Sequence, residues 1–159
     1  LDAAILKSGT KRVIARRGMR IVLDENVSLT ILFPDRDMSG ADTNDASVIV
    51  RLVYGENEFL LTGDAPQKIE NYLVSLDGME LESDVLKAGH HGSKTSTSEL
   101  FLGYVSPEYV VVSSGKNNQY GHPHKEVLAL LEKFAIPFLN TAEVGTIIFE
   151  SDGETVRLR

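Results

Sequence analysis

The chain has 159 residues, of which 42% are hydrophobic and 25% are charged, and it contains no cysteine and no tryptophan. This length and composition predict a single globular domain over residues 1–159 and exclude a disordered chain. No run of about 18 apolar residues occurs, so we expect no membrane-spanning segment and a soluble chain. The lack of cysteine excludes disulfides, thiolate metal sites and cysteine nucleophiles.

The net charge of −7 is unevenly distributed. Residues 1–20 carry six basic residues and one acidic residue, whereas the rest of the chain is strongly acidic. An acidic chain is a poor general binder of nucleic acid. The basic start is therefore interpreted either as a contact for phosphates or as the solvated face of a strand pair.

The first half of the chain predicts paired strands. Residues Arg12–Arg16 and Met19–Leu23 flank Gly18 and predict a hairpin. The alternating segment Ser28–Phe33 predicts a further strand. A second hairpin is predicted from Ala46–Tyr54 and Phe59–Thr62, which a Gly-containing turn separates.

The second half alternates helical and strand-like segments. Helices are predicted from Pro66 to Gly78, over Ser98–Tyr104 and after His124. Strands are predicted over Asp84–Ala88 and Tyr109–Val112, near Phe138, and over Thr146–Glu150 and Thr155–Leu158. Paired strands followed by strand–helix alternation predict the α/β class, with helices packed on a mixed sheet.

Candidate chemistry is concentrated in three loops that follow predicted strands. All four histidines lie between positions 90 and 124, in two Gly-containing loops, and a third loop ends in Gly63-Asp64. The carboxyl ends of strands are where open α/β sheets place their sites. One carboxylate and several imidazoles suit zinc, manganese or iron. The candidate ligands that these loops offer are Asp64, His90, His91, His122 and His124.

Structural interpretations of the same residues stay open. Asp64 has the side chain of a helix N-cap, directly before the helix that Pro66 opens. His124 could be a surface residue in the first turn of its helix. Ser93 and Ser96 could cap the following segment.

Three motifs together resemble the metallo-β-lactamase superfamily. They are Leu60–Asp64, then Asp84–Ser93 with its His-His-Gly-Ser end, then Gly121–His124. The resemblance extends from about residue 18 to the C-terminus. It is strongest to the hydrolase-like domain at the C-terminal end of ComEC-type competence proteins.

The resemblance implies an αββα sandwich with mixed sheets and a dinuclear metal site, with zinc as the expected metal and manganese as the alternative. It implies that Asp64 bridges the two metals, and that His90, His91 and His122 are ligands or substrate contacts. His124 matches the same motif. His91 and Ser93 are the implied catalytic residues, and Ser93 would hydrogen-bond a substrate oxygen.

The chain departs from the superfamily in one respect. The His-x-His-x-Asp-His motif, which supplies most ligands in that superfamily, is absent, and no histidine precedes His90. The chain is therefore expected to be the C-terminal portion of such a domain. Either the full protein carries the motif upstream or this is a variant that lost it, and Leu1 in place of Met favours the former. We expect no full dinuclear site and weak or no catalysis from this chain alone.

The function implied is hydrolysis of DNA phosphodiesters linked to DNA uptake. The alternatives are an inert binding or structural domain and a hydrolase of another ester or lactone. The implied partners are DNA, the missing N-terminal part of the domain and transmembrane segments of a longer protein. That protein would be membrane-attached, with this domain on the extracytoplasmic side. Half a sandwich would also leave apolar sheet surface exposed, which predicts self-association.

Overall fold

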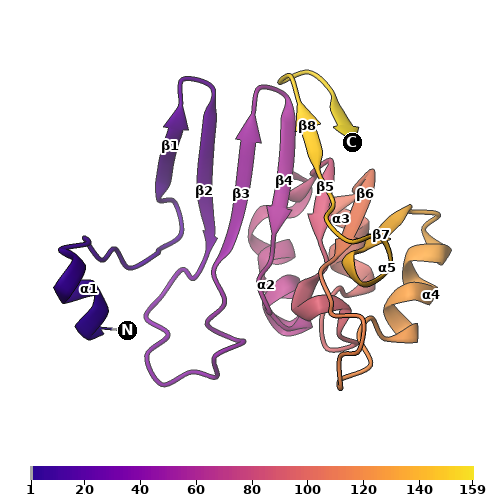
Figure 1. Ribbon diagram of the computed structural model, residues 1–159, viewed down its shortest axis with the longest axis horizontal. Helices are drawn as coiled ribbons and strands as arrows, with labels where there is room; N and C mark the ends of the chain where they lie inside the picture. The colour runs from indigo at the N-terminus through magenta and orange to yellow at the C-terminus, as the bar shows by residue number, and fades with distance from the viewer. Residues whose placement is uncertain (1) are drawn as a thin grey trace.

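A mixed seven-stranded sheet organises the computed structural model, which describes residues 2–159 (Figure 1). The strand order follows the chain from β1 to β7. The strands are β1 Arg20–Asp24, β2 Val27–Phe33, β3 Ile49–Tyr54, β4 Asn57–Leu61, β5 Val85–Lys87, β6 Tyr109–Val112 and β7 Phe138–Asn140. Pairs from β1 to β4 are antiparallel, and pairs from β4 to β7 are parallel. The sheet thus has an antiparallel half, β1–β4, and a parallel half, β4–β7, whose strands are connected through helices. The two halves share strand β4.

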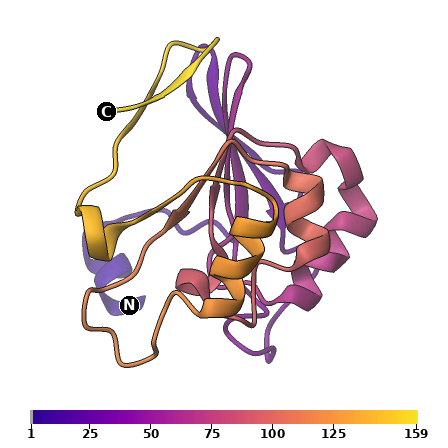
Figure 2. The same cartoon turned by 90° about the vertical axis from the view of Figure 1, so that its right-hand side faces the viewer.

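The three longest crossover helices, α2, α3 and α4, pack on one face of the sheet. Figure 2 shows the sheet nearly edge-on, with α2, α3 and α4 together on one side. The helices and 3-10 turns are α1 Asp2–Ser8, α2 Gln67–Asp77, η1 Gly78–Leu81, η2 Gly89–Gly92, α3 Glu99–Val105, α4 Lys125–Lys133 and α5 Thr141–Val144. Core side chains between the helices and the sheet, among them Leu60, Leu73, Leu86, Phe101 and Leu131, are almost completely buried. Burial of this apolar layer drives the packing of the helices onto the sheet.

A short hairpin covers one end of the opposite face. It consists of β8 Phe149–Ser151 and β9 Val156–Leu158. The ring of Phe149 packs against Phe59 and Tyr109, with centroids 6.3 and 5.6 Å away. The rest of this face is more open, since Leu61 of β4 is 39% exposed. The described residues therefore form one large sheet with α2, α3 and α4 layered on one face, plus this small second sheet.

The α/β class predicted from the sequence is confirmed, and most predicted strands are present. The strand predicted over Arg12–Arg16 is wrong, because in the described chain these residues form a loop. Backbone hydrogen bonds tie that loop to the end of β2, from Arg17 N to the carbonyl of Pro34 and from Gly18 N to that of Ile31. The partner of β2 is β1, to which it is joined by a tighter turn at residues 25–26. Alternation alone did not distinguish Arg12–Arg16 from β2 as the partner of β1.

Strand β1 forms one edge of the sheet, and all five of its residues are exposed. The described helices are short, the longest being α2 with 11 residues. Among residues 2–159, no helix has the length and apolar character needed to cross a bilayer.

Candidate metal and hydrolytic site

Three loops meet at the carboxyl ends of β4, β5 and β6. Residues 62–65 follow β4, residues 88–98 follow β5, and residues 113–124 follow β6. These strands are parallel neighbours, so their carboxyl ends meet at one edge of the sheet. The topology thus brings together the loops that carry the predicted site residues.

Asp64 presents its carboxylate from the loop after β4 and is not a helix cap. Helix α2 begins at Gln67, its N-cap position is Pro66, and no side-chain cap bond is made there. The N-cap interpretation of Asp64 is therefore wrong. Its backbone N–H donates to Ser47 Oγ at 3.1 Å, and its side chain is 38% exposed.

His90 and His91 form a tight turn in which both residues adopt left-handed backbone conformations. Their φ/ψ values are 46°/47° and 58°/27°. For residues other than glycine, such conformations cost on the order of 1–3 kcal/mol each and are concentrated at functional sites. The flanking glycines make the turn possible. A Cβ at Gly89 would lie 2.8 Å from Ser96 Cβ, and one at Gly92 would lie 2.7 Å from Pro123 Cβ.

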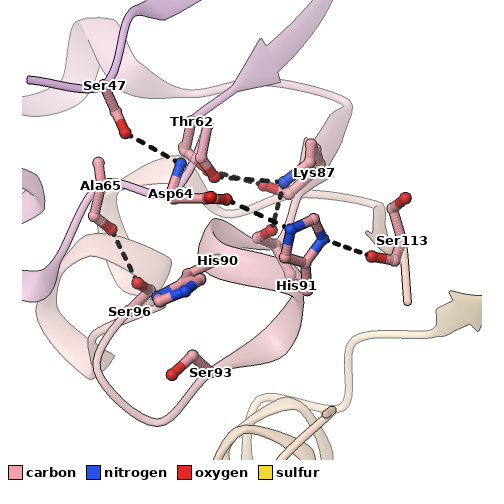
Figure 3. Close-up of polar contacts among 12 residues, drawn as sticks. Ser47, Thr62, Asp64, Ala65, Lys87, His90, His91, Ser93, Ser96 and Ser113 are labelled. Atoms are coloured by element: carbon pink, nitrogen blue, oxygen red, sulfur yellow. Dashed lines mark hydrogen bonds and ion pairs between the residues drawn. The ribbon is translucent and has the colours of Figure 1, made fainter. Parts of the chain in front are cut away.

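His91 is oriented by a hydrogen bond and faces Asp64. Its Nδ1 lies 2.7 Å from the carbonyl oxygen of Ser113, and its Nε2 lies 3.6 Å from Asp64 Oδ1 (Figure 3). A carbonyl only accepts hydrogen bonds, so Nδ1 carries the proton that it donates. In the neutral ring, Nε2 then has a free lone pair directed toward Asp64.

The other predicted histidines lie around this pair. The His122 ring centroid is 5.6 Å from that of His90, 6.4 Å from that of His91 and 4.8 Å from that of His124. Burial, together with the neighbouring histidines, lowers the pKa of His122. A lowered pKa favours the neutral imidazole, which is the form that binds metals.

His124 and Ser93 make local hydrogen bonds. His124 occupies the N-cap position of α4 without a side-chain cap bond, and its Nδ1 accepts the backbone N–H of Lys94 at 3.0 Å. Ser93 is buried, and its Oγ lies 3.0 Å from Thr95 Oγ1. Figure 3 places Ser93 away from the contact between Asp64 and His91. The ligand role of His124 and the catalytic role of Ser93 stay predictions.

Lys87 belongs to the site but was not singled out from the sequence. Its Nζ donates to the carbonyl of Gly63 at 3.2 Å and to that of Ala88 at 3.1 Å, which links the loops after β4 and β5. Burial lowers its pKa, and the charge of Asp64 opposes that shift. The feature of the sequence that could have indicated Lys87 is a lysine at the end of an otherwise apolar strand.

Glu70 is a second residue that the sequence reasoning missed. It is fully buried in α2 and accepts the backbone N–H groups of Thr97 and Ser98 at 2.6 and 2.8 Å. It thereby fixes the end of the loop that contains His90 and His91. Burial raises its pKa to about 7, although these hydrogen bonds oppose the shift. The feature of the sequence that could have indicated Glu70 is a carboxylate on the apolar, buried face of an amphipathic helix.

The donor set agrees with a zinc or manganese site in its chemistry but is incomplete in its geometry. Carboxylate and imidazole are suitable ligands for both metals. Within residues 2–159, however, no group of three or more His, Cys, Asp or Glu side chains is arranged to hold a metal ion. Zinc sites in proteins use at least three protein ligands. The described residues thus bring Asp64 and His91 into contact but do not assemble three ligands around one metal position.

The fold is similar to that of a solved hydrolase structure. A structure from Parabacteroides distasonis ATCC 8503, assigned as a metal-dependent hydrolase, matches with a TM-score of 0.52 and 13% identity. The match covers 88% of this chain and 61% of the other. At this identity the comparison establishes the fold alone.

Three curated relatives share more sequence with the chain. They are ComE operon protein 3 of Bacillus subtilis (40% identical over 107 residues), competence protein ComA of Neisseria gonorrhoeae (41% over 125) and recombination protein 2 of Haemophilus influenzae (38% over 123). These matches cover 67%, 79% and 77% of this chain but only 14%, 18% and 15% of the relatives, so the chain spans less than a fifth of their length. No family model matches the chain. The chain is homologous to a segment of these ComEC-type competence proteins.

Proposed function

We propose that the chain contributes part of the active site of a metal-dependent hydrolase that cleaves DNA phosphodiesters during DNA uptake. The observation that carries this proposal is the geometry of His91, whose Nδ1 is fixed by the Ser113 carbonyl and whose Nε2 faces Asp64. Metal-binding histidines are typically held in this way by a hydrogen bond to the second ring nitrogen. The competence relatives support the link to DNA uptake.

Asp64 and His91 are the residues that would hold the metal, zinc first and manganese as the alternative. A bound divalent metal would supply a Lewis acid for the phosphoryl oxygen and a water of lowered pKa. The remaining ligands are proposed to come from parts of the longer protein outside these 159 residues. A bridging role of Asp64 between two metals belongs to the same proposal.

Three further side chains lie around Asp64 and His91 and are proposed to support the site. Lys87 holds the loops after β4 and β5 together through two backbone carbonyls. The lowered pKa of His122 favours its neutral form, which can accept a proton or contact a substrate oxygen. His90 lies close enough to His122 to share that role.

A second candidate function is an inert binding or structural domain. It is favoured by the lack, within the described residues, of any three ligands arranged for one metal. The two functions differ in whether the longer protein completes the site.

The proposed partners are DNA, the remaining part of the hydrolase domain and a second copy of the chain. The longer protein is proposed to be attached to the membrane, with this domain on the extracytoplasmic side. The apolar face that the β8–β9 hairpin leaves open is the surface proposed to meet the remaining part of the domain.

The experiment that tests the function compares the longer protein with the chain 1–159. Each is freed of metal, supplied with zinc or manganese, and assayed for cleavage of labelled single-stranded and duplex DNA, with ester and lactone substrates assayed in parallel. We expect metal-dependent cleavage of DNA by the longer protein and little or none by the chain 1–159. A longer protein that binds no metal and cleaves no substrate would instead favour the inert domain.

A further inference from the structure

A pocket of about 600 Å³ adjoins the candidate site, and apart from His122 its lining has no role in the proposed hydrolysis. It lies between the loop after β6, strand β7, α5 and the start of α4, and His122 forms part of its wall. Its apolar side includes Pro123, Leu128 and Phe138. Lys116 is a cation in its lining and Glu143 an anion. The volume lies in the range of pockets that bind small organic molecules.

An exposed aromatic ring lies beside this pocket. Tyr120 is 67% exposed, and its ring is stacked on His122 with centroids 5.7 Å apart and an interplanar angle of 23°. Asn118 holds this part of the loop, because its side chain bonds both the backbone N–H and the carbonyl of His122. The Tyr120 ring is thus supported on the His122 side and largely open to solvent elsewhere.

These features match the chemistry of a nucleotide. Nucleobases are planar, bind apolar surfaces and stack on aromatic side chains, while the attached phosphate pairs with a cation. Phe138 and Leu128 provide the apolar surface, Tyr120 provides a stacking surface, and Lys116 provides the cation. Because His122 belongs both to the pocket wall and to the candidate site, a nucleotide bound there would lie next to the groups proposed to act on its phosphodiester.

We propose that this pocket and Tyr120 bind an unstacked nucleotide of single-stranded DNA. The inference rests on the proposed function, to which it adds the form of the DNA and the residues that recognise it. In a duplex, bases are paired and stacked, so one would have to leave the helix at an energetic cost before entering. The pocket therefore selects single strands over duplex DNA.

Stacking is the main contribution to this binding. The charges of Lys116 and Glu143 oppose each other in the pocket lining, and the chain carries a net charge of −7. With Lys116 as the phosphate contact, the salt dependence is that of roughly one neutralised phosphate, a slope of about −0.7 in log affinity against log salt.

The experiment measures binding of fluorescein-labelled oligonucleotides to the chain 1–159 by anisotropy, in EDTA. The probes are an eight-residue thymidine single strand, the same backbone with abasic sites, and a duplex of equal length. We expect the single strand to bind about tenfold more tightly than either other probe, consistent with typical base–aromatic stacking. Tyr120→Ala should remove about tenfold of that affinity, while Tyr120→Phe should retain it. Lys116→Gln should weaken the single strand and the abasic backbone equally.

The control is Phe134→Ala, which removes another partly exposed ring, at the C-terminal end of α4, and should leave binding unchanged. Circular dichroism of each variant confirms its fold. Equal affinity for the abasic backbone, tighter binding of duplex, no measurable binding, or unchanged affinity in folded Tyr120→Ala would each overturn the inference. Base-dependent binding by the chain without hydrolysis by the metal-loaded longer protein would refute the proposed function alone.

Discussion

Nε2 of His91 lies 3.6 Å from Oδ1 of Asp64, although the two residues follow different strands of the sheet. Asp64 follows β4 and His91 follows β5, and these strands are parallel neighbours. The contact therefore depends on the parallel pairing and on the left-handed turn at His90 and His91. Both electron-pair donors are directed at a common region, with the second nitrogen of His91 engaged by Ser113.

Replacing the Asp64 carboxylate with an amide should abolish hydrolysis by the longer protein. Asp64→Asn removes the negative charge that would hold a cation, but its side chain is partly exposed, so the free energy of unfolding should change by less than about 0.5 kcal/mol. Cleavage rates and urea denaturation measure the two effects. Asp45→Asn, at a nearby carboxylate paired with Lys68, is the control and should stay active. Full activity of Asp64→Asn would refute a metal-binding role for Asp64.

The histidines should differ in their contribution to metal binding. His91→Ala removes the nitrogen that faces Asp64 and should weaken zinc binding at least tenfold, the scale on which metal sites respond to such changes. His124→Ala should change it less than threefold, because Nδ1 of His124 accepts a hydrogen bond from Lys94 and the ring proton then lies on Nε2. Isothermal titration of the metal-free longer protein measures both. A larger loss in His124→Ala than in His91→Ala would reverse this assignment.

Glu70 should make stability depend on pH between about 4.5 and 7. Its folded pKa is raised to about 7, so the neutral form is favoured in the folded state. The contribution of Glu70 to the free energy of unfolding is fully present below the unfolded pKa of 4.5. It is lost as the pH rises through the folded pKa of about 7. A shift of this size corresponds to about 3 kcal/mol. The free energy of unfolding of the wild type, relative to Glu70→Gln, should fall by that amount over this range.

Urea denaturation of both proteins at several pH values isolates this effect, because all other titrating groups are the same in the two chains. If the two pH profiles run parallel, Glu70 ionises normally in the folded protein.

Arg17 should be the strongest ionic contact between the first loop and the helical layer. Both of its terminal nitrogens donate to the Asp77 carboxylate, and Nη1 also donates to the Leu32 carbonyl at 2.9 Å. The Asp77 side chain is only 6% exposed, so Arg17→Met would leave its carboxylate poorly solvated. We expect a loss of about 2 kcal/mol in the free energy of unfolding. The exposed pair of Arg159 and Glu150 is the control, and Arg159→Met should cost less than about 0.5 kcal/mol.

The chain 1–159 should self-associate through its exposed sheet edge. Ile21 and Val22 of β1 are 49% and 67% exposed, on an edge strand with unpaired backbone groups. Light scattering after size exclusion should show a mass that rises with concentration. Val22→Lys should restore the monomer, since charged residues on an edge strand oppose pairing. A wild-type chain that stays monomeric at all concentrations would exclude this association.

The sequence predicted the class of fold because its strong periodicities coincide with well-packed elements. The apolar spacing of Ile69 and Leu73 predicted α2, and the valine run of Tyr109–Val112 predicted β6. The prediction failed at Arg12–Arg16, because this segment and Val27–Phe33 were both possible partners of β1 and short-range alternation could not rank them. That competition is decided by the turn at residues 25–26 and by the anchoring of Arg17, which are tertiary effects.

The position of the candidate site could be predicted, because its residues directly follow the ends of strands. Which histidine faces Asp64, and which side chains are engaged in local hydrogen bonds, could not be predicted. Two left-handed residues at His90 and His91 decide which nitrogen faces Asp64, and no local pattern signals them. The hydrogen bonds that occupy His124 and Ser93 come from residues in the loop after β5, including Lys94 and Thr95. Lys87 and Glu70 act through backbone groups distant in sequence.

The change from antiparallel to parallel pairing at β4 has a consequence for the order of folding. Strands β1–β4 pair with sequence neighbours, whereas β4–β7 pair only after long helical connections have closed. Contacts between distant segments form slowly, because loop closure must precede them. Asp64 follows β4 and His91 follows β5, so their contact forms only after the crossover through α2 has closed and β5 has paired with β4.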